Sequence, residues 1–163
     1  MIYIRHGEKV YNNRGGEKGL DSPLKEKSRK EVRKKARELI AEYGVPNTIF
    51  VSPYLRARQT AEEMKKEIKQ DIDLIVLPEL GEYLGNWREI NENMFEGETF
   101  AYGIIKEDSF EELKQRAKKG SLNNCWYITH GTFIEALVSN LEDKRYYPKF
   151  LRGVHIGEKI TFI

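Results

Sequence analysis

The sequence has 163 residues, a length typical of one domain, and such a domain can bury a core without disulfides or metals. Its 28 Lys and Arg residues nearly balance its 26 Asp and Glu residues, and a net charge of +2 argues against a dedicated nucleic-acid-binding protein. Cys125 is the single cysteine, which excludes an intrachain disulfide and favours a reducing compartment. The opening MIYIRH does not resemble a signal peptide, and no apolar run approaches the roughly 20 residues of a membrane span. We therefore expect one cytoplasmic domain over residues 1–163.

The first half of the chain alternates short apolar runs with amphipathic stretches. We expect strands at Ile2–Ile4, Thr48–Val51 and Ile72–Leu77, and helices at 25–43 and at about 54–69. Gly44 is placed to cap the first of these helices. Its apolar residues share one face, and the Lys and Arg residues of KEKSRKEVRKKAR lie on the other. A solvated face with interspersed Glu pairs is the favoured interpretation of that basic run, over a recognition helix.

The second half begins with residues 86–108, which have little periodicity and are expected to be irregular or to form short helices. We expect a helix over 109–119, because Ser109 and Glu112 form a capping box and Gly120 follows its end. A strand at Trp126–Ile128, a helix from Thr132 to about Leu141, and one or two strands from Val154 to Ile163 follow. Strands that alternate with helices predict an α/β layer fold with a mostly parallel sheet.

Chemically active side chains follow four of the expected strands. They are Arg5, His6 and Gly7 after the first strand, Ser52 and Arg56 after the second, Glu82 after the third, and His130 with Gly131 after the fourth. Ligands of such sheets bind beyond the carboxyl ends of the strands. We therefore expect these residues to converge on one edge of the sheet.

This set of residues has what phosphoryl transfer needs. The transferring group spreads negative charge over three equatorial oxygens, with the attacking and leaving atoms in line. His6 can be a covalent nucleophile, Arg5 and Arg56 can hold the oxygens, and His130 can add a donor. Glu82 can protonate the leaving oxygen and then activate water, and Gly7 lets the backbone approach the site. None of these steps requires a metal or another cofactor.

Each of these residues alone has a structural explanation. A histidine at a strand end is more often structural than catalytic, and a lone arginine is usually an ordinary salt-bridge partner. Cys125 lies beside Trp126 without metal-ligand spacing and is expected to be core, and His155 is expected to be structural. The functional prediction depends on the joint pattern.

The same residues carry a family resemblance that extends along nearly the whole chain. Its motifs, in order, are Arg5-His6-Gly7-Glu8 with Asn12, Asp21–Leu24 followed by Lys25-Glu26-Lys27, Ser52–Ala61 (SPYLRARQTA), Leu80–Trp87 (LGEYLGNW), and Thr129-His130-Gly131. Together they resemble the histidine phosphatase superfamily, the phosphoglycerate-mutase-like proteins. The resemblance implies a three-layer α/β/α sandwich and metal-independent chemistry.

The resemblance also implies roles for individual residues. His6 would be phosphorylated, Glu82 would donate the proton, and Arg5, Arg56 and His130 would complete the phosphate pocket. Two further contacts, from Asn12 and from the backbone N–H of Thr132, are implied as well. Departures from the family pattern are Ser28, Thr132 and Arg88. The segment between Glu82 and Trp126 is short, which predicts a reduced lid over the substrate.

Hydrolysis of phosphate monoesters is the favoured activity, with a small phosphorylated metabolite as substrate. A mutase must keep water out with a long insertion and an ordered tail, whereas this sequence stops right after its last expected strand. Removal of phosphate from phosphohistidine in a partner protein is a second alternative, although the relatives that do this often lack the acid. A silent phosphate-binding module would lack the nucleophile or an arginine.

The substrate itself is not specified by these motifs. A basic mouth suits sugar phosphates, phosphoglycerates and nucleotides alike. Its candidate residues are Lys9, Arg14, Lys18, Arg58 and Arg88. Arg58 is equally well explained as a substrate ligand or as a helix-surface residue.

Overall fold

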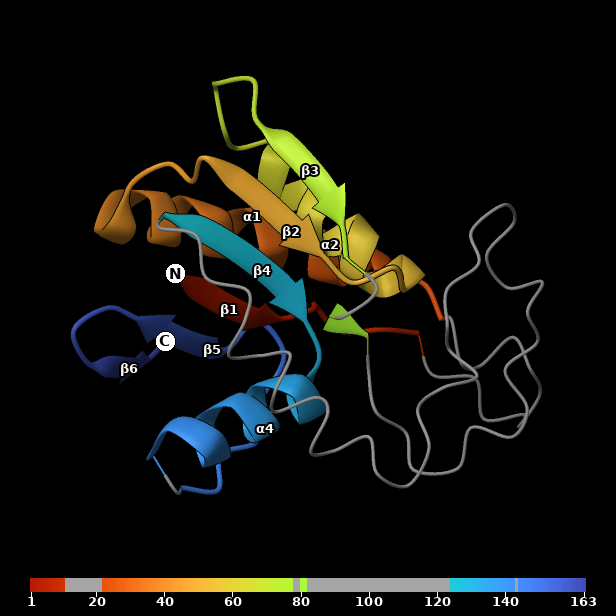
Figure 1. Ribbon diagram of the computed structural model, residues 1–163. Coiled ribbons are helices and arrows are strands. Elements are labelled where there is room, and N and C mark those ends of the chain that lie inside the picture. The colour runs from red at the N-terminus through yellow and green to blue at the C-terminus, as the bar shows by residue number, and fades with distance from the viewer. Residues whose placement is uncertain (11–21, 78–79, 82–123, 143) are drawn as a thin grey trace.

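A six-stranded mixed sheet forms the centre of the computed structural model, which describes residues 1–10, 22–77, 80–81, 124–142 and 144–163 (Figure 1). The strands are β1 (Ile2–Arg5), β2 (Thr48–Val51), β3 (Asp73–Val76), β4 (Cys125–Thr129), β5 (Gly153–Ile156) and β6 (Ile160–Phe162). Their spatial order is β3-β2-β4-β1-β5-β6. The first four are parallel to one another, while β5 and β6 add antiparallel pairs at the β1 side. The predicted α/β class with a mostly parallel sheet is confirmed.

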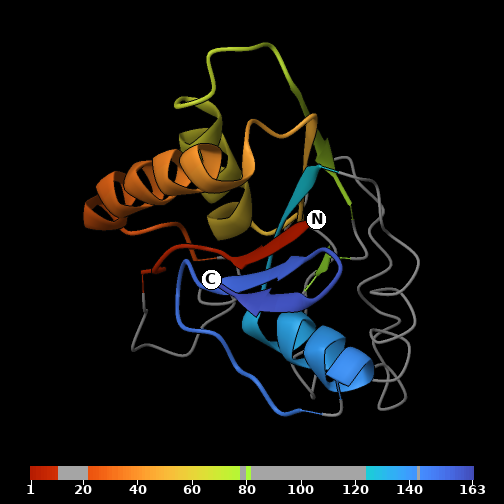
Figure 2. The ribbon, with the colours of Figure 1, turned by 90° about the vertical axis from the view of Figure 1, so that its left-hand side faces the viewer.

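Helices cover both faces of this sheet. The helices α1 (Glu26–Tyr43) and α2 (Leu55–Lys65) pack together on one face, and α4 (Gly131–Glu142) covers the other (Figures 1 and 2). This arrangement is the predicted three-layer α/β/α sandwich. In the described part of the chain, no helix combines the length and the apolar character that crossing a bilayer would require.

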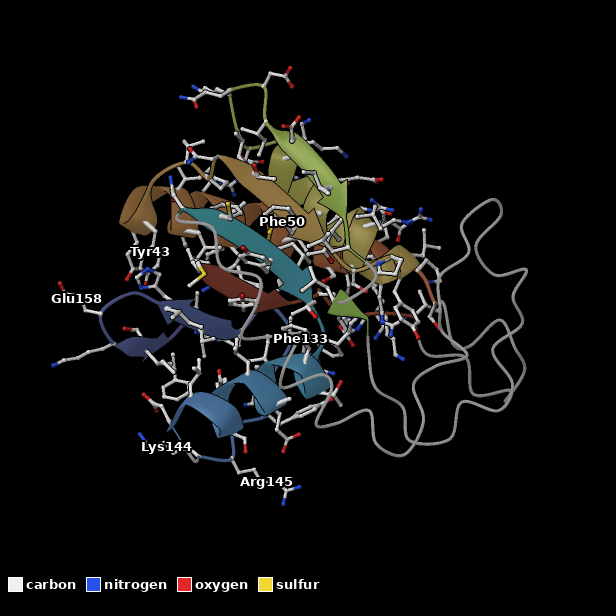
Figure 3. The ribbon with its side chains drawn as sticks, viewed as in Figure 1. Tyr43, Phe50, Phe133, Lys144, Arg145 and Glu158 are labelled. Atoms are coloured by element: carbon white, nitrogen blue, oxygen red, sulfur yellow. The ribbon has the colours of Figure 1, made fainter. Side chains whose placement is uncertain are left out.

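Two separate cores follow from the alternation of side chains along the strands. On β1, Ile2 and Ile4 face α1 and α2, whereas Tyr3 faces α4. On that second face Tyr3 stacks on Tyr127, with ring centroids 4.4 Å apart, and Tyr127 lies 5.1 Å from Phe50. Figure 3 shows Phe133 between α4 and the sheet, and its ring is 6.0 Å from that of Tyr3. These aromatic contacts fix α4, and with it the residue that precedes it, against the strands.

The helix α2 ends at Lys65, four residues before the predicted end at about 69. The chain continues in tighter turns, in which the amides of Glu67 and Ile68 donate to the carbonyls of Met64 and Lys65. Ile68 still packs into the core, so the apolar periodicity runs past the end of the helix. The strand β3 is likewise shorter by one residue at each end than predicted. The predicted irregular segment 86–108, the helix 109–119 and the reduced lid lie outside the described residues.

Part of the basic side of α1 forms ion pairs with α2. Arg29 and Arg33 contact the buried carboxylate of Glu63 at 2.8 and 3.1 Å, and Lys66 contacts the same carboxylate at 2.6 Å. Burial raises the pKa of Glu63, but the hydrogen bonds from Lys66 and Arg29 outweigh it and leave the pKa below its usual value. The expected solvated face is therefore also an ion-pair interface that joins the two helices.

Candidate active site

The site begins where β1 ends. The parallel pairing of β1 with β4 continues past the strand, because the His6 amide donates to the Thr129 carbonyl at 2.9 Å. His6 is 2% exposed, and its ring lies at the carboxyl edge of the sheet. The strand β1 therefore places a buried imidazole at the edge of the sheet where α/β folds of this type bind their ligands.

Both ring nitrogens of His6 have a partner. Nδ1 lies 2.7 Å from the Gly7 carbonyl oxygen, and Nε2 accepts a hydrogen bond of 3.1 Å from Nε of Arg56. A guanidinium group can only donate, so the proton belongs on Nδ1 and Nε2 has its lone pair. Burial lowers the pKa of His6 well below its usual value, and the charge of Arg56 lowers it further. His6 is thus a neutral imidazole with its lone pair on Nε2.

Four hydrogen bonds close a ring around His6. His6 donates to the Gly7 carbonyl, and the Gly7 amide donates to Thr60 Oγ1 at 3.0 Å. The Thr60 hydroxyl donates to the Arg56 carbonyl at 2.7 Å, and the Arg56 side chain donates back to His6. The Gly7 amide and the Arg56 guanidinium can only donate, and the two carbonyls can only accept. The imidazole and the hydroxyl group, which could do either, are therefore left with one arrangement each. The ring therefore fixes the His6 tautomer and ties the β1 loop to α2.

Arg56 is the buried cation at the centre of the site. It lies in the first turn of α2 and is fully buried. Its guanidinium lies over the ring of Tyr54, with Cζ 4.4 Å from the centroid, and its Nη2 lies 3.5 Å from Nδ1 of His130. Arg56 therefore contacts both histidines at once.

His130 comes from the end of β4, directly before α4. Its ring is fully buried and meets the ring of His6 edge-on, with centroids 5.1 Å apart. Nε2 of His130 lies 2.7 Å from Ser52 Oγ. Burial lowers the pKa of His130 well below its usual value, and the charge of Arg56 acts in the same direction. Both histidines are thus neutral beside a permanent cation.

Arg5 is held by the segment that follows α4. Its Nη1 donates to the Pro148 carbonyl at 2.8 Å. Its guanidinium carbon lies 4.9 Å from the Tyr147 ring centroid and 4.3 Å from that of Phe150. The Phe150 ring also lies 5.6 Å from that of His6. Two aromatic rings and a carbonyl therefore orient a cation next to His6.

Fixed positive charge dominates the site. The charges of Arg56, Arg5 and Lys9 all lower the pKa values of both histidines. An anion with two or more negative charges would be attracted by this potential. Among the described residues, no group of three or more His, Cys, Asp and Glu side chains could hold a metal ion.

The sequence matches the histidine phosphatase superfamily (branch 1) over residues 1–157. The chain belongs to this superfamily. The match spans every described element that contributes to the site. The predicted resemblance is confirmed, and the superfamily together with its phosphatase neighbours supports a phosphatase.

Solved structures of similar fold include several phosphatases. A structure of the protein histidine phosphatase SixA with tungstate is 23% identical, with a TM-score of 0.60 over 99% of this chain and 92% of that one. A protein from Thermus thermophilus, TTHB049, is 22% identical, with a TM-score of 0.62 over 94% and 90% of the two chains. A mycobacterial glucosyl-3-phosphoglycerate phosphatase is 21% identical, with a TM-score of 0.54 over 88% and 79%. At these identities the likeness establishes a shared fold. The curated proteins include no match to this chain.

Within this superfamily member, Gly7 and Gly131 are glycines for reasons of packing. A Cβ on Gly7 would lie 2.7 Å from Leu24 Cδ1 and 2.8 Å from Ser28 Oγ, so the residue must be small to fit against α1. Gly7 was predicted to let the backbone approach a phosphate, and in the structure its carbonyl and amide take part in the ring around His6. A Cβ on Gly131 would lie 2.6 Å from the Tyr147 ring.

The remaining predicted residues lie in different places. Thr132 is in the first turn of α4, where backbone N–H groups are unpaired within a helix, and its Oγ1 is buried. Arg58 lies two residues after buried Arg56, which is about 200° around the helix, and is partly exposed. That position favours the surface interpretation of Arg58. Asn12 and Glu82 lie outside the described residues, as does Arg88.

The sequence prediction missed the roles of two hydroxyl groups. Ser52 contacts His130, and Thr60 closes the ring around His6. Both stand inside the motif Ser52–Ala61, so the signal was their presence in a motif whose arginine alone was given a function. The aromatic support of Arg5 was also missed, because Tyr147 and Phe150 belong to no quoted motif.

Proposed function

We propose that this superfamily member hydrolyses phosphate monoesters of small metabolites through a covalent phosphohistidine on His6. One observation carries the proposal: the neutral, buried His6 directs the Nε2 lone pair at the guanidinium of Arg56. A phosphoryl group bound by Arg56 would lie within reach of that lone pair. The nucleophile, His6, and the cation that would bind the phosphoryl group, Arg56, are therefore already in hydrogen-bond contact.

The first half-reaction transfers the phosphoryl group to the protein. Nε2 of His6 forms a bond to phosphorus while the bond from phosphorus to the leaving oxygen breaks. Arg5, Arg56 and His130 stabilise the charge on the equatorial oxygens. Glu82, assigned from its motif, gives its proton to the leaving oxygen. The leaving group departs as a neutral alcohol.

The second half-reaction restores the enzyme. Glu82, now ionised, takes a proton from water while that water's oxygen attacks phosphorus. The bond between phosphorus and Nε2 breaks, and inorganic phosphate forms. Nδ1 of His6 remains protonated against the Gly7 carbonyl throughout, so His6 leaves as the neutral imidazole it was at the start.

The remaining sequence expectations belong to this proposal. We propose a single domain over residues 1–163, a cytoplasmic location, and activity without a metal, nucleic acid or membrane. We propose a small phosphorylated metabolite as the substrate. Relatives of similar fold include a phosphoserine phosphatase from Entamoeba histolytica in complex with 3-phosphoglyceric acid, at 18% identity and a TM-score of 0.52.

The nucleophile is tested by trapping the intermediate. Brief incubation with a labelled phosphate ester and rapid quenching should give an acid-labile, base-stable protein phosphate. His6→Ala should abolish both label and turnover. His155→Ala is the matched control, because His155 lies in β5 with its ring 4.5 Å from that of Tyr43 in α1, and it should leave both unchanged. Label on a serine or aspartate, or turnover by His6→Ala at the wild-type rate, would refute the assignment.

The acid is tested through the leaving group. Glu82→Gln should slow hydrolysis of alkyl phosphates far more than that of an activated aryl phosphate, whose leaving oxygen needs little protonation. Equal losses on both substrates would mean that Glu82 is not the acid. Including EDTA in every assay tests independence from metal, and loss of turnover in EDTA that added metal restores would contradict it.

Phosphohistidine in a protein is the second candidate substrate. It is favoured by the close match in extent with the SixA structure, in which this chain covers 92% of that chain. A panel containing metabolite phosphates, 2,3-bisphosphoglycerate and a phosphohistidine peptide separates the two. Preference for the peptide by kcat/KM would replace the metabolite with a protein substrate while leaving the role of His6 intact.

A further inference from the structure

Ser52 is a buried hydroxyl group at the end of β2. Its amide donates to the Ile128 carbonyl at 2.9 Å, which continues the pairing of β2 with β4 past the strand. The side chain is fully buried, and Oγ lies 2.7 Å from Nε2 of His130. Two neighbouring strands therefore bring a serine and a histidine into direct contact at the carboxyl edge of the sheet.

The two nitrogens of His130 face different groups. Nε2 faces Ser52, and Nδ1 faces Arg56 Nη2 in a long contact of 3.5 Å. A neutral imidazole has one N–H, so one nitrogen donates while the other accepts. Because the guanidinium can only donate, Nδ1 accepts here, and the N–H at Nε2 donates to Ser52 Oγ.

A phosphoryl group bound beside Nδ1 of His130 would require the opposite tautomer. Its oxygens are acceptors, so Nδ1 must then present an N–H, and Nε2 must accept a hydrogen bond instead. A hydroxyl group can both donate and accept, whereas a carbonyl oxygen can only accept and a backbone amide can only donate. Ser52 is thus able to satisfy Nε2 in either tautomer. The two tautomers have the same number of protons, so the charge of the site does not change between them.

We propose that Ser52 is a positioning residue for the phosphatase reaction, whose hydroxyl holds the His130 ring and donates to Nε2 when Nδ1 donates to the phosphoryl oxygens. This inference rests on the proposed function. Ser52 acts through His130 and touches no reacting atom. Burial and the surrounding cations keep His130 neutral, which makes its tautomer decisive.

Ser52 also has a local structural role that the test must separate. The Tyr54 amide lies 3.4 Å from Ser52 Oγ, in the turn that leads into α2 and Arg56. Loss of the hydroxyl could therefore disturb Arg56 as well as His130. A double-mutant cycle distinguishes the two routes, because an effect that passes through His130 vanishes when His130 is absent.

We expect Ser52→Ala to lower kcat about 10- to 100-fold in the wild-type background, with a smaller change in KM. In the His130→Ala background the same substitution should change kcat by less than about 2-fold. Ser28→Ala is the matched control, since Ser28 is also fully buried and its Oγ accepts from the Glu8 amide at 3.0 Å. Its effect should be equal in both backgrounds. An equal loss from Ser52→Ala in both backgrounds, or no loss in either, would overturn the proposal.

A second measurement needs no variant. In protein with ¹⁵N-labelled histidine, the His130 signals should report protonation at Nε2 in the free protein and at Nδ1 in the complex with tungstate. The resonance is assigned by its absence in His130→Ala. Nε2 that keeps its proton in the tungstate complex would overturn the donor role of Ser52, even if Ser52→Ala fails to fold.

The two proposals fail in different ways. If no phosphohistidine forms on His6 and His6→Ala turns over normally, the proposed function is wrong, whatever the tautomer of His130. If His6 is phosphorylated but the tautomer does not change, the phosphatase assignment holds and the role of Ser52 is wrong. The combination of trapping and NMR therefore identifies which of the two has failed.

Discussion

Thr60→Val tests the hydrogen-bonded ring that surrounds His6. The two side chains have nearly the same shape, but valine can neither accept from the Gly7 amide nor donate to the Arg56 carbonyl. The Gly7 amide is buried, so it loses its partner without gaining water. The His6 ring then keeps its bonds to Gly7 and Arg56, but the peptide that orients it is no longer tied to α2.

The magnitude follows from these contacts. An unpaired buried amide destabilises the fold by about 1–3 kcal/mol, which for a chain of this length lowers Tm by roughly 2–4 °C per kcal/mol. Thr60→Ser keeps the hydroxyl and removes one buried methyl group, at a cost of about 1 kcal/mol. Because small displacements of a nucleophile are costly, we expect Thr60→Val to slow phosphoenzyme formation about 10- to 100-fold. Thr60→Ser should stay within about 3-fold of wild type.

Two assays measure these effects. Urea unfolding gives the free energy of unfolding for both variants, and rapid-quench labelling gives the rate at which His6 is phosphorylated. The comparison between valine and serine isolates the hydroxyl group from the packing. If both variants are phosphorylated at the same rate, the ring does not position His6, and its hydrogen bonds serve stability alone.

Three further predictions concern stability. Below about pH 6.5 the unfolded chain protonates His6 and His130, whereas the folded chain does not. In the absence of phosphate the free energy of unfolding should therefore fall as the pH falls, by up to about 1.4 kcal/mol per pH unit for each histidine. Glu63→Gln removes the carboxylate shared by three partly exposed cations and should lower the unfolding free energy by about 1–3 kcal/mol. Gly153→Ala puts a Cβ 1.8 Å from a β1 carbonyl oxygen and should destabilise by about 4 kcal/mol or more. Urea unfolding measures all three.

Each of these has a matched comparison. Replacing His6 and His130 with Asn and Gln should flatten the pH dependence between pH 6.5 and 5.5, and an unchanged slope would contradict the linkage. Glu62→Gln, on the exposed side of α2, should change stability by less than about 0.5 kcal/mol. In Gly157→Ala the new Cβ would lie 3.1 Å from a His155 side-chain atom that can move. Equal losses from Gly153→Ala and Gly157→Ala would show that the β1 carbonyl is not the obstacle.

The convergence of His6, Arg56 and His130 was predictable because it follows from strand order. Parallel strands bring their carboxyl ends to one edge, so residues that follow β1, β2 and β4 meet there whatever the loops do. The bounds of β2 were also predicted correctly, since a run of β-branched and aromatic residues between Asn47 and Ser52 favours a strand. The apolar periodicity of the sequence therefore predicts well at which position of a strand or helix a residue lies.

Partners from distant parts of the chain were not predictable. Ser52 and His130 are 78 residues apart, and Gly7 and Thr60 are 53 apart, and no local pattern joins them. The end of α2 was overestimated because buried Ile68 keeps the helical spacing after the helical hydrogen bonds have changed. These long-range contacts and the end of α2 depend on tertiary packing, which local sequence patterns do not reveal.

The support of Arg5 links the site to the order in which the chain is made. Arg5 is one of the first residues, but the carbonyl that orients it belongs to Pro148, 143 residues later. The strand β1 likewise lies between β4 and β5, both of which follow it by more than a hundred residues. A nascent chain therefore has Arg5 long before the groups that hold it. Phosphatase activity should appear only after the segment beyond α4 has docked, so the site reports the completion of folding.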